Sequence, residues 1–182
     1  IEKIIAACPT DRPVEVRDKA IILLLARLGL RAGDVRDMRL DDIDWRGGYI
    51  RVKGKTRRPD RLPLPQDVGD AILAYLAEAR PKTADPHLFV RAQAPFRSFR
   101  SSAEIAGIVA RTHDRGGIEG VPTGSHIFRH SLATNLLRAG AGLESVGTIL
   151  RHSSPETTAI YAKVDLPMLM KIAQPWPGEQ SC

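Results

Sequence analysis

The segment from His126 to His130, with the sequence HIFRH, holds residue types that can act on a phosphate group. On a helix, His126 and Arg129 are three residues apart and share one face, so both side chains can reach a single ligand. An arginine offers a rigid fork of donors that matches phosphate oxygens, and an imidazole can donate a hydrogen bond or move a proton. The pair predicts a phosphate site, although a surface helix with ion pairs is the simpler interpretation of these residues taken alone.

A second arginine, Arg31, follows the apolar residues that end at Leu30 and precedes Asp34. It lies between two expected helices, so its place in the fold is well anchored. Its simpler role is structural, because it can cap the carbonyls at the end of the preceding helix or pair with Asp34.

Positive charge is concentrated from Lys53 to Arg58, where the sequence KGKTRR places four cations in six residues. The glycine among them permits a tight turn. Such a loop either contacts an anionic partner or is simply solvated.

A histidine and a tyrosine follow near the end of the chain. His152 precedes an expected helix, and Tyr161 comes nine residues later. A tyrosine hydroxyl can act as a nucleophile once its proton is removed. For Tyr161 in isolation, core packing with an exposed hydroxyl is the simplest interpretation.

The elements that position these residues begin with a helix expected from Val14 to Leu28, whose apolar residues occupy nearly every face. A glycine ends it, and a short helix from Gly33 to Arg39 follows. Alternating residues predict a strand at Tyr49–Val52 and a return strand at Arg61–Pro65, joined by the basic tip. A third strand is expected at His87–Val90.

The remaining elements are helices, expected at roughly residues 67–79, 101–113, 125–138, 143–150 and 155–163. The predicted fold class is therefore α+β, a mainly helical domain with a small antiparallel three-stranded sheet near its N-terminal third. One domain is expected over residues 1–173, followed by a flexible tail over residues 174–182. Because a helical pattern starts at Ile1, we expect that the chain was trimmed from a longer one.

The composition favours an anionic partner. Lys and Arg outnumber Asp and Glu by 27 to 21, which gives a net charge of +6 and a pI near 9.7. Nucleic acid fits that balance, as does an ordinary basic protein. The cysteines, Cys8 and Cys182, form no disulfide framework or metal-ligand spacing, and the longest apolar run, residues 20–26, is too short to cross a bilayer. A cytoplasmic protein is expected.

Taken in their order along the chain, the Arg31 turn, the basic hairpin tip, the HIFRH segment and the His152–Tyr161 segment resemble the tyrosine recombinase or phage integrase family. That family builds its active site from a GLR arginine, a hairpin lysine, an HxxR pair, a histidine and a tyrosine nine residues later. The stretch HIFRHSLAT, residues 126–134, is similar to the family's HxLRHxxAT, and the resemblance covers roughly residues 17–163. It implies these catalytic residues: Arg31, Lys55, His126, Arg129, His152 and Tyr161.

The match leaves one alternative and shows two departures. Lys53 competes with Lys55 for the place of the hairpin lysine, and Lys55 is preferred because it follows a glycine as the family's lysine does. Asp34 stands where the family usually has glutamate, which is a conservative change. Arg151 replaces the glycine before the histidine, which puts the presentation of His152 in question.

The resemblance implies site-specific DNA recombination, as in integration of mobile elements, through a 3′-phosphotyrosine intermediate. Arginines, a lysine and histidines supply the positive charge, so no metal, ATP or other cofactor is expected. The implied partner is double-stranded DNA, with a monomer in isolation and a tetramer on DNA in the full-length protein, where residues 165–172 would dock on a neighbour. The family's N-terminal DNA-clamping domain has no counterpart in this sequence.

Two other functions fit some of the same residues. A type IB topoisomerase uses similar chemistry to reseal the same strand, but the histidine before Arg129 favours a recombinase. A non-catalytic DNA-binding module would use the basic loop and helices only for phosphate contacts. In that case Tyr161 would carry no activity.

Overall fold

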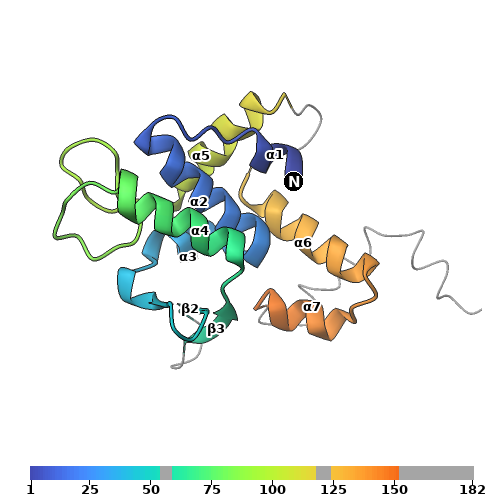
Figure 1. The fold of residues 1–182 in the computed structure, drawn as a ribbon. Coiled ribbons are helices and arrows are strands. Elements are labelled where there is room, and N and C mark those ends of the chain that lie inside the picture. Colours follow the sequence, from blue (N-terminus) through green and yellow to red (C-terminus); the bar gives the residue numbers. More distant parts are fainter. Residues whose placement is uncertain (54–58, 118–123, 152–182) are drawn as a thin grey trace, which may run out of the picture. The chain divides into compact units, whose positions relative to one another are not determined.

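The computed structural model describes residues 1–53, 59–117 and 124–151 of the 182-residue chain. The chain divides into two compact units, Ile1–Leu132 and Ala133–Cys182. The first unit contains most of the helices and the sheet (Figure 1). The helix predicted at residues 155–163 lies outside the described residues.

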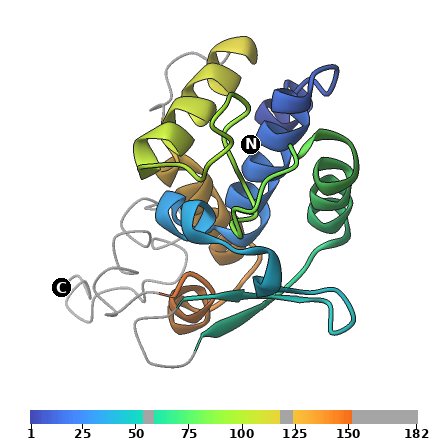
Figure 2. The same cartoon turned by 90° about the vertical axis from the view of Figure 1, so that its left-hand side faces the viewer.

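Helix α2 (Pro13–Leu28) is the centre of the first unit. Its residues from Ala20 to Leu25 are all buried, as their apolar character on every face predicts. Helix α2 contacts the π-helix η2 (Tyr75–Ala79) and four α-helices of this unit: α1 (Glu2–Ala6), α3 (Ala32–Asp37), α4 (Gln66–Ala74) and α5 (Ser102–Arg115). Helices α4 and α5 flank α2 on opposite sides (Figure 2). This packing fixes the end of α2, where Gly29 adopts the left-handed conformation with φ of 58°.

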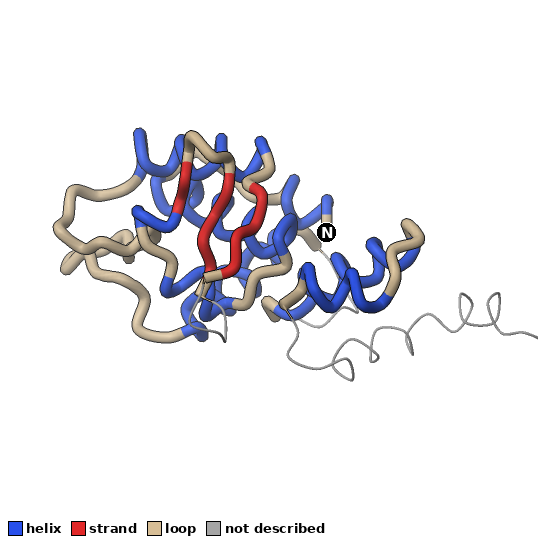
Figure 3. Tube along the Cα trace, turned by 90° about the horizontal axis from the view of Figure 1, so that it is seen from below, coloured by secondary structure: helices blue, strands red, loops and turns tan. Residues whose placement is uncertain are grey.

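The sheet has three antiparallel strands in the order β1-β2-β3, namely Ile43–Asp44, Tyr49–Val52 and Asp60–Pro63 (Figure 3). The short helix η1 (Leu40–Asp42) precedes β1. In β2, Ile50 and Val52 are buried and the alternate residues are half-buried, so one face covers the core.

The prediction of a third strand at His87–Val90 was wrong, because β1 is the third strand. His87 and Val90 each form only an isolated bridge, with Arg39 and Ser98 respectively. The run is apolar because Leu88, Phe89 and Val90 are fully buried in the core, not because it belongs to the sheet.

The helices agree with the prediction to within a few residues. Helix α4 continues into the π-helix η2 (Tyr75–Ala79), and together they cover the predicted 67–79. Helix α6 (His126–Arg138) begins in the first unit and ends in the second, where α7 (Leu143–Ile149) follows. Gly140, with φ of 88°, lies in the break between them. Among the described residues, no helix is long and apolar enough to cross a membrane.

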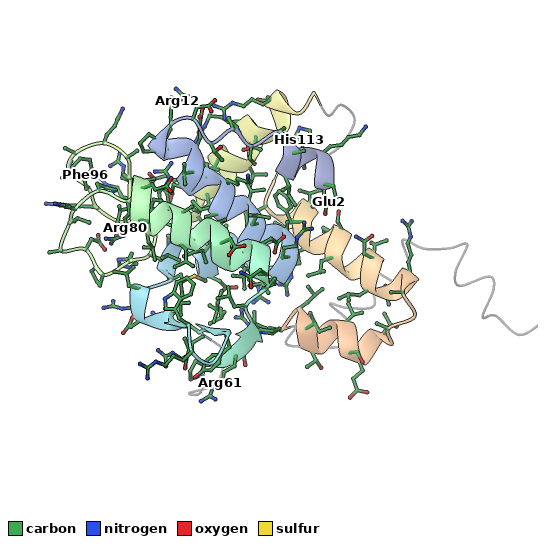
Figure 4. All side chains as sticks on the ribbon, in the orientation of Figure 1. Glu2, Arg12, Arg61, Arg80, Phe96 and His113 are labelled. Atoms are coloured by element: carbon green, nitrogen blue, oxygen red, sulfur yellow. The ribbon has the colours of Figure 1, made fainter. Side chains whose placement is uncertain are left out.

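The segment 80–100, which joins η2 to α5, is ordered by polar side chains at its base. The Arg80 guanidinium donates hydrogen bonds to the carbonyls of Asp85, His87 and Leu88 at 2.7–3.1 Å. The Asp85 carboxylate accepts from the backbone N–H groups of His87 and Ser98, and it lies 2.7 Å from His87 Nδ1. These bonds hold the segment in one defined conformation, and Figure 4 labels Arg80 and Phe96 on it.

Replacing Asp85 by asparagine is expected to destabilise this loop. Burial alone would raise the pKa of Asp85, but the hydrogen bonds from His87 and Ser98 outweigh it and lower the pKa from 3.8 to about 2. Because the pKa is lower in the folded protein, the ionised Asp85 stabilises the fold fully when the pH is above the ordinary pKa of 3.8. This stabilisation is lost as the pH falls toward 2. We expect the free energy of unfolding of the Asp85→Asn variant to be about 1–2 kcal/mol lower than that of the parent at pH 7. At pH 3 this difference should be roughly half as large.

Urea unfolding from pH 7 to pH 3 measures this difference, with Asp114→Asn at an exposed position of α5 as the matched control. A gap between the Asp85 variant and the parent that stays the same at every pH would show that its ionisation is not what holds the loop.

Candidate active site

Arg31 lies at the turn between α2 and α3, as the N-cap residue of α3. Its backbone N–H donates to the Asp34 carboxylate at 3.1 Å, and its side chain is half-buried. A carboxylate three residues after the N-cap is a common way to satisfy a free N–H at a helix start. Asp34 thus fixes the backbone that carries Arg31, in addition to being a departure from the family pattern.

Arg129 is buried, with 6% of its surface exposed, although it carries a charge. Its Nη1 donates a hydrogen bond of 2.7 Å to the carbonyl oxygen of Gly29, which is 100 residues away in sequence. Because Gly29 is left-handed, it ends α2 and leaves its carbonyl outside the helical hydrogen-bond pattern. The bond connects α6 to the Gly29-Leu30-Arg31 turn, so the structure brings the two predicted arginine positions to one place.

His126 is the first residue of α6 and is exposed, whereas Arg129 one turn later is buried. The backbone N–H of Ile127 donates to the carbonyl of Gly124 at 3.1 Å, which holds the start of the helix. The imidazole therefore lies at the surface, one helical turn from the buried guanidinium.

Of the two hairpin lysines, Lys55 lies outside the described residues and Lys53 is the last described residue before that gap. Lys53 is exposed at the end of β2 and lines a small cavity of about 40 Å³ together with Asp34 and Asp37 of α3. The pKa of Asp37 is lowered, first by its hydrogen bond with Arg36 and further by the charge of Lys53. Strand β2 thus ends beside the helix that Arg31 begins.

His152 and Tyr161 lie outside the described residues, but the residue before His152 does not. Arg151 follows the end of α7 with φ of 55°, the left-handed conformation that favours glycine. Its backbone N–H donates to the Thr148 carbonyl at 3.0 Å. The backbone here adopts the conformation that a glycine would favour, even though the residue is arginine.

This conformation predicts an unusual order of stability at position 151. Glycine normally destabilises a helix by about 1 kcal/mol relative to alanine. At a left-handed position the order reverses, so Arg151→Gly is expected to be more stable than Arg151→Ala by about 1 kcal/mol. Comparing the two variants with each other, by urea unfolding, cancels the loss of the arginine side chain. An alanine variant equal to or more stable than the glycine variant would contradict the left-handed turn.

Among the described residues, no group of three or more His, Cys, Asp or Glu side chains is arranged to hold a metal ion. The polar groups that the structure gathers near Arg31 are instead a buried arginine, a helix-capping carboxylate and the end of a basic hairpin strand.

Comparison with known proteins identifies relatives of this chain. The model of the phage integrase family covers residues 1–166. A putative integrase/recombinase, y4rA of Sinorhizobium fredii, is 49% identical over 98% of this chain, which spans 44% of that relative. Tyrosine recombinase XerA of Thermococcus kodakarensis is 33% identical over 94% of this chain, which spans 58% of that protein. The chain thus spans about half the length of these relatives.

Solved structures agree on the fold. A crystal structure of XerA recombinase superposes with a TM-score of 0.77 at 27% identity, covering 94% of this chain and 60% of that one. XerH recombinase in a post-cleavage complex with its difH substrate gives a TM-score of 0.79 at 22% identity, covering 94% of this chain and 50% of that one. The fold is that of a tyrosine recombinase catalytic domain. The chain belongs to the phage integrase family.

Proposed function

We propose that this chain is the catalytic domain of a site-specific DNA recombinase, which cuts and rejoins DNA through a 3′-phosphotyrosine intermediate at Tyr161. The observation that carries the proposal is the hydrogen bond from Arg129 to the Gly29 carbonyl, which brings a buried guanidinium to the turn that bears Arg31. Two arginines held on packed elements can bind both nonbridging oxygens of one phosphate, where charge accumulates in the transition state.

In the proposed cleavage step, the Tyr161 oxygen attacks phosphorus and the bond to the 5′ oxygen breaks. His126 accepts the phenol proton, and Arg31 and Arg129 stabilise the pentavalent transition state. Lys55 donates a proton to the departing 5′ oxygen, and His152 donates a hydrogen bond to a nonbridging oxygen. Attack by a new 5′-hydroxyl reverses the step and rejoins the strands without ATP. The mechanism needs no metal, because the cationic side chains supply the positive charge.

The proposed substrate is double-stranded DNA. The net charge of +6 supports it, as do the solved structures of XerH on difH and of the Tn1549 transposon integrase with transposon end DNA. We further propose one catalytic domain over residues 1–173 with a tail over residues 174–182, acting in the cytoplasm. In isolation it would be a monomer, and the full-length protein would assemble as a tetramer on DNA.

The test is a trap for the covalent intermediate. The substrate is a duplex with a recombination site of the family. It is nicked so that the short fragment with the new 5′-hydroxyl diffuses away after cleavage. It is incubated with the chain in EDTA, and the products are run on a denaturing gel. We expect a protein–DNA adduct that keeps a label placed on the 3′-phosphate side of the break. A label retained only on the 5′ side, or cleavage that EDTA abolishes, would contradict the proposal.

The choice between the two hairpin lysines has its own test. Lys55→Ala is expected to slow cleavage by about 100-fold or more, because an unprotonated 5′ alkoxide is a poor leaving group. In a substrate with sulfur in place of the bridging 5′ oxygen, the thiolate leaves without being protonated. This substrate should therefore restore the cleavage rate of the Lys55 variant.

Lys53→Ala is the matched control, since it removes the same charge at the end of β2. We expect a change of less than about threefold for it on either substrate. If the sulfur substrate restored the cleavage rate of the Lys53 variant and not that of the Lys55 variant, Lys53 would be the general acid.

A further inference from the structure

The loop of residues 81–100 presents positive charge together with an exposed aromatic ring. Arg91, Arg97 and Arg100 lie between Asp85 and Glu104 with no acidic residue in that interval, and Arg91 forms a partly exposed ion pair of 3.6 Å with Glu104. Phe96, at the tip, is 37% exposed (Figure 4). The loop extends beyond the end of η2, away from the sheet (Figure 1). An exposed phenylalanine among arginines on a projecting loop has the composition of a nucleic-acid contact.

Two further hydrogen bonds hold the part of the loop around Phe96. The Thr83 hydroxyl donates to the carbonyl of Phe96 at 2.9 Å, and the backbone N–H of Arg91 donates to the carbonyl of Arg97 at 2.8 Å. These bonds connect the two sides of the loop around Phe96. A preformed loop loses little conformational entropy when it binds, so its contacts can contribute to affinity.

The loop is also anchored to the elements that carry the candidate active site. Leu88 donates a backbone hydrogen bond to the carbonyl of Met38, just after α3. The buried guanidinium of Arg17, in α2, donates to the carbonyl of Val90 at 3.0 Å and lies over the Phe99 ring. The helical stretch from Arg17 to Gly29 is about 18 Å long, at about 1.5 Å per residue. The loop anchor and the Gly29 turn thus lie at opposite ends of one helix.

We propose that the loop of residues 81–100 is a second contact with duplex DNA, away from the cleaved phosphate. Arg91 and Arg97 bind backbone phosphates, and the ring of Phe96 packs against sugars in the groove between them. DNA is favoured over an acidic protein because the same helix, α2, carries the loop anchor at one end and the proposed phosphate site at the other. The inference rests on the proposed function only for the position of the contact, since binding does not need cleavage.

The test measures equilibrium binding of the chain to a duplex carrying the site, at several salt concentrations. The double variant Arg91→Ala/Arg97→Ala is expected to bind at least tenfold more weakly, with a salt slope smaller by about 2, because each phosphate contact contributes about 0.9. Phe96→Ala is expected to bind about fivefold more weakly with an unchanged salt slope. Circular dichroism of each variant checks that the fold is retained.

The matched control is Arg46→Ala/Arg115→Ala, which removes the same charge from exposed positions in the β1–β2 turn and at the end of α5. Losses equal to those of the loop variant would mean that only net charge matters and would overturn the proposal. So would loop variants that bind DNA normally but lose self-association, because the partner would then be protein.

The position is tested with methylphosphonates, which remove the charge of single phosphates. Neutral linkages are placed one at a time on both sides of the break, and at one or two positions away from the cleaved phosphate they should weaken DNA binding by the parent chain and have no effect on binding by the Arg91/Arg97 double variant. An effect confined to the cleaved phosphate would overturn the loop contact. All of these measurements can be made with Tyr161→Phe, so a failure of the covalent chemistry is distinguishable from a failure of the loop proposal.

Discussion

A Tyr161→Phe variant is expected to form no covalent adduct with trapped DNA, a loss of at least about a thousandfold, because the attacking oxygen is removed. A free phenol has a pKa near 10, so only about one molecule in a thousand is ionised at neutral pH. The reaction therefore depends on a neighbouring base such as His126 and on the arginines that stabilise the anion. Equilibrium DNA binding should stay within about twofold of the parent, because a hydroxyl adds little to a phosphate interface.

The chain provides two matched controls, since its other tyrosines are both described. Tyr49, in β2, lies under the guanidinium of Arg61 at 4.9 Å, and Tyr75 is buried with its hydroxyl accepting from the N–H of Val90 at 3.3 Å. Tyr49→Phe and Tyr75→Phe should keep the adduct, the latter with about 1 kcal/mol less stability. If one of these lost the adduct while Tyr161→Phe kept it, the nucleophile would have been misassigned.

The helices of this chain could be predicted from the sequence, and the reason is local. Helix α2 is apolar on every face and is followed by a glycine, so composition and a stop signal agree. The strands were harder. Strand β1, Ile43–Asp44, is too short for an alternating pattern, whereas Leu88 to Val90 is a short apolar run with an aromatic and a β-branched residue, which is typical of a strand. The core buries both kinds of segment, and hydrophobicity alone does not distinguish them.

The candidate site could be predicted as a set of residues but not as an arrangement. The family resemblance selected Arg31 and Arg129, yet no local pattern indicates that a buried guanidinium would bind the Gly29 carbonyl 100 residues away. Asp34 is the opposite case, because its spacing after Arg31 already fits a helix cap. A rule that assigns left-handed backbone positions to glycine does not predict that Arg151 adopts this conformation.

The geometry of Arg129 leads to the second large prediction, in which stability and catalysis separate. Arg129→Ala leaves the Gly29 carbonyl without its partner, which is expected to cost about 1–3 kcal/mol of stability, and it also removes a transition-state charge. We expect its cleavage rate to fall by at least about 100-fold to 1,000-fold. Both losses together would not reveal whether the arginine acts on the phosphate or only braces the fold.

Arg129→Lys resolves that ambiguity. A lysine ammonium is a single point of charge, whereas the guanidinium fork can donate to Gly29 and to a phosphate oxygen at the same time. The lysine variant should therefore recover most of the stability while its cleavage rate stays at least about 100-fold below that of the parent. Single-turnover adduct formation and urea unfolding measure the two quantities, with Arg138→Ala at the exposed end of the same helix as the control. If the lysine variant cleaves at the parent rate, Arg129 serves only to connect α6 to the Gly29 turn, and the proposed phosphate site loses one of its two arginines.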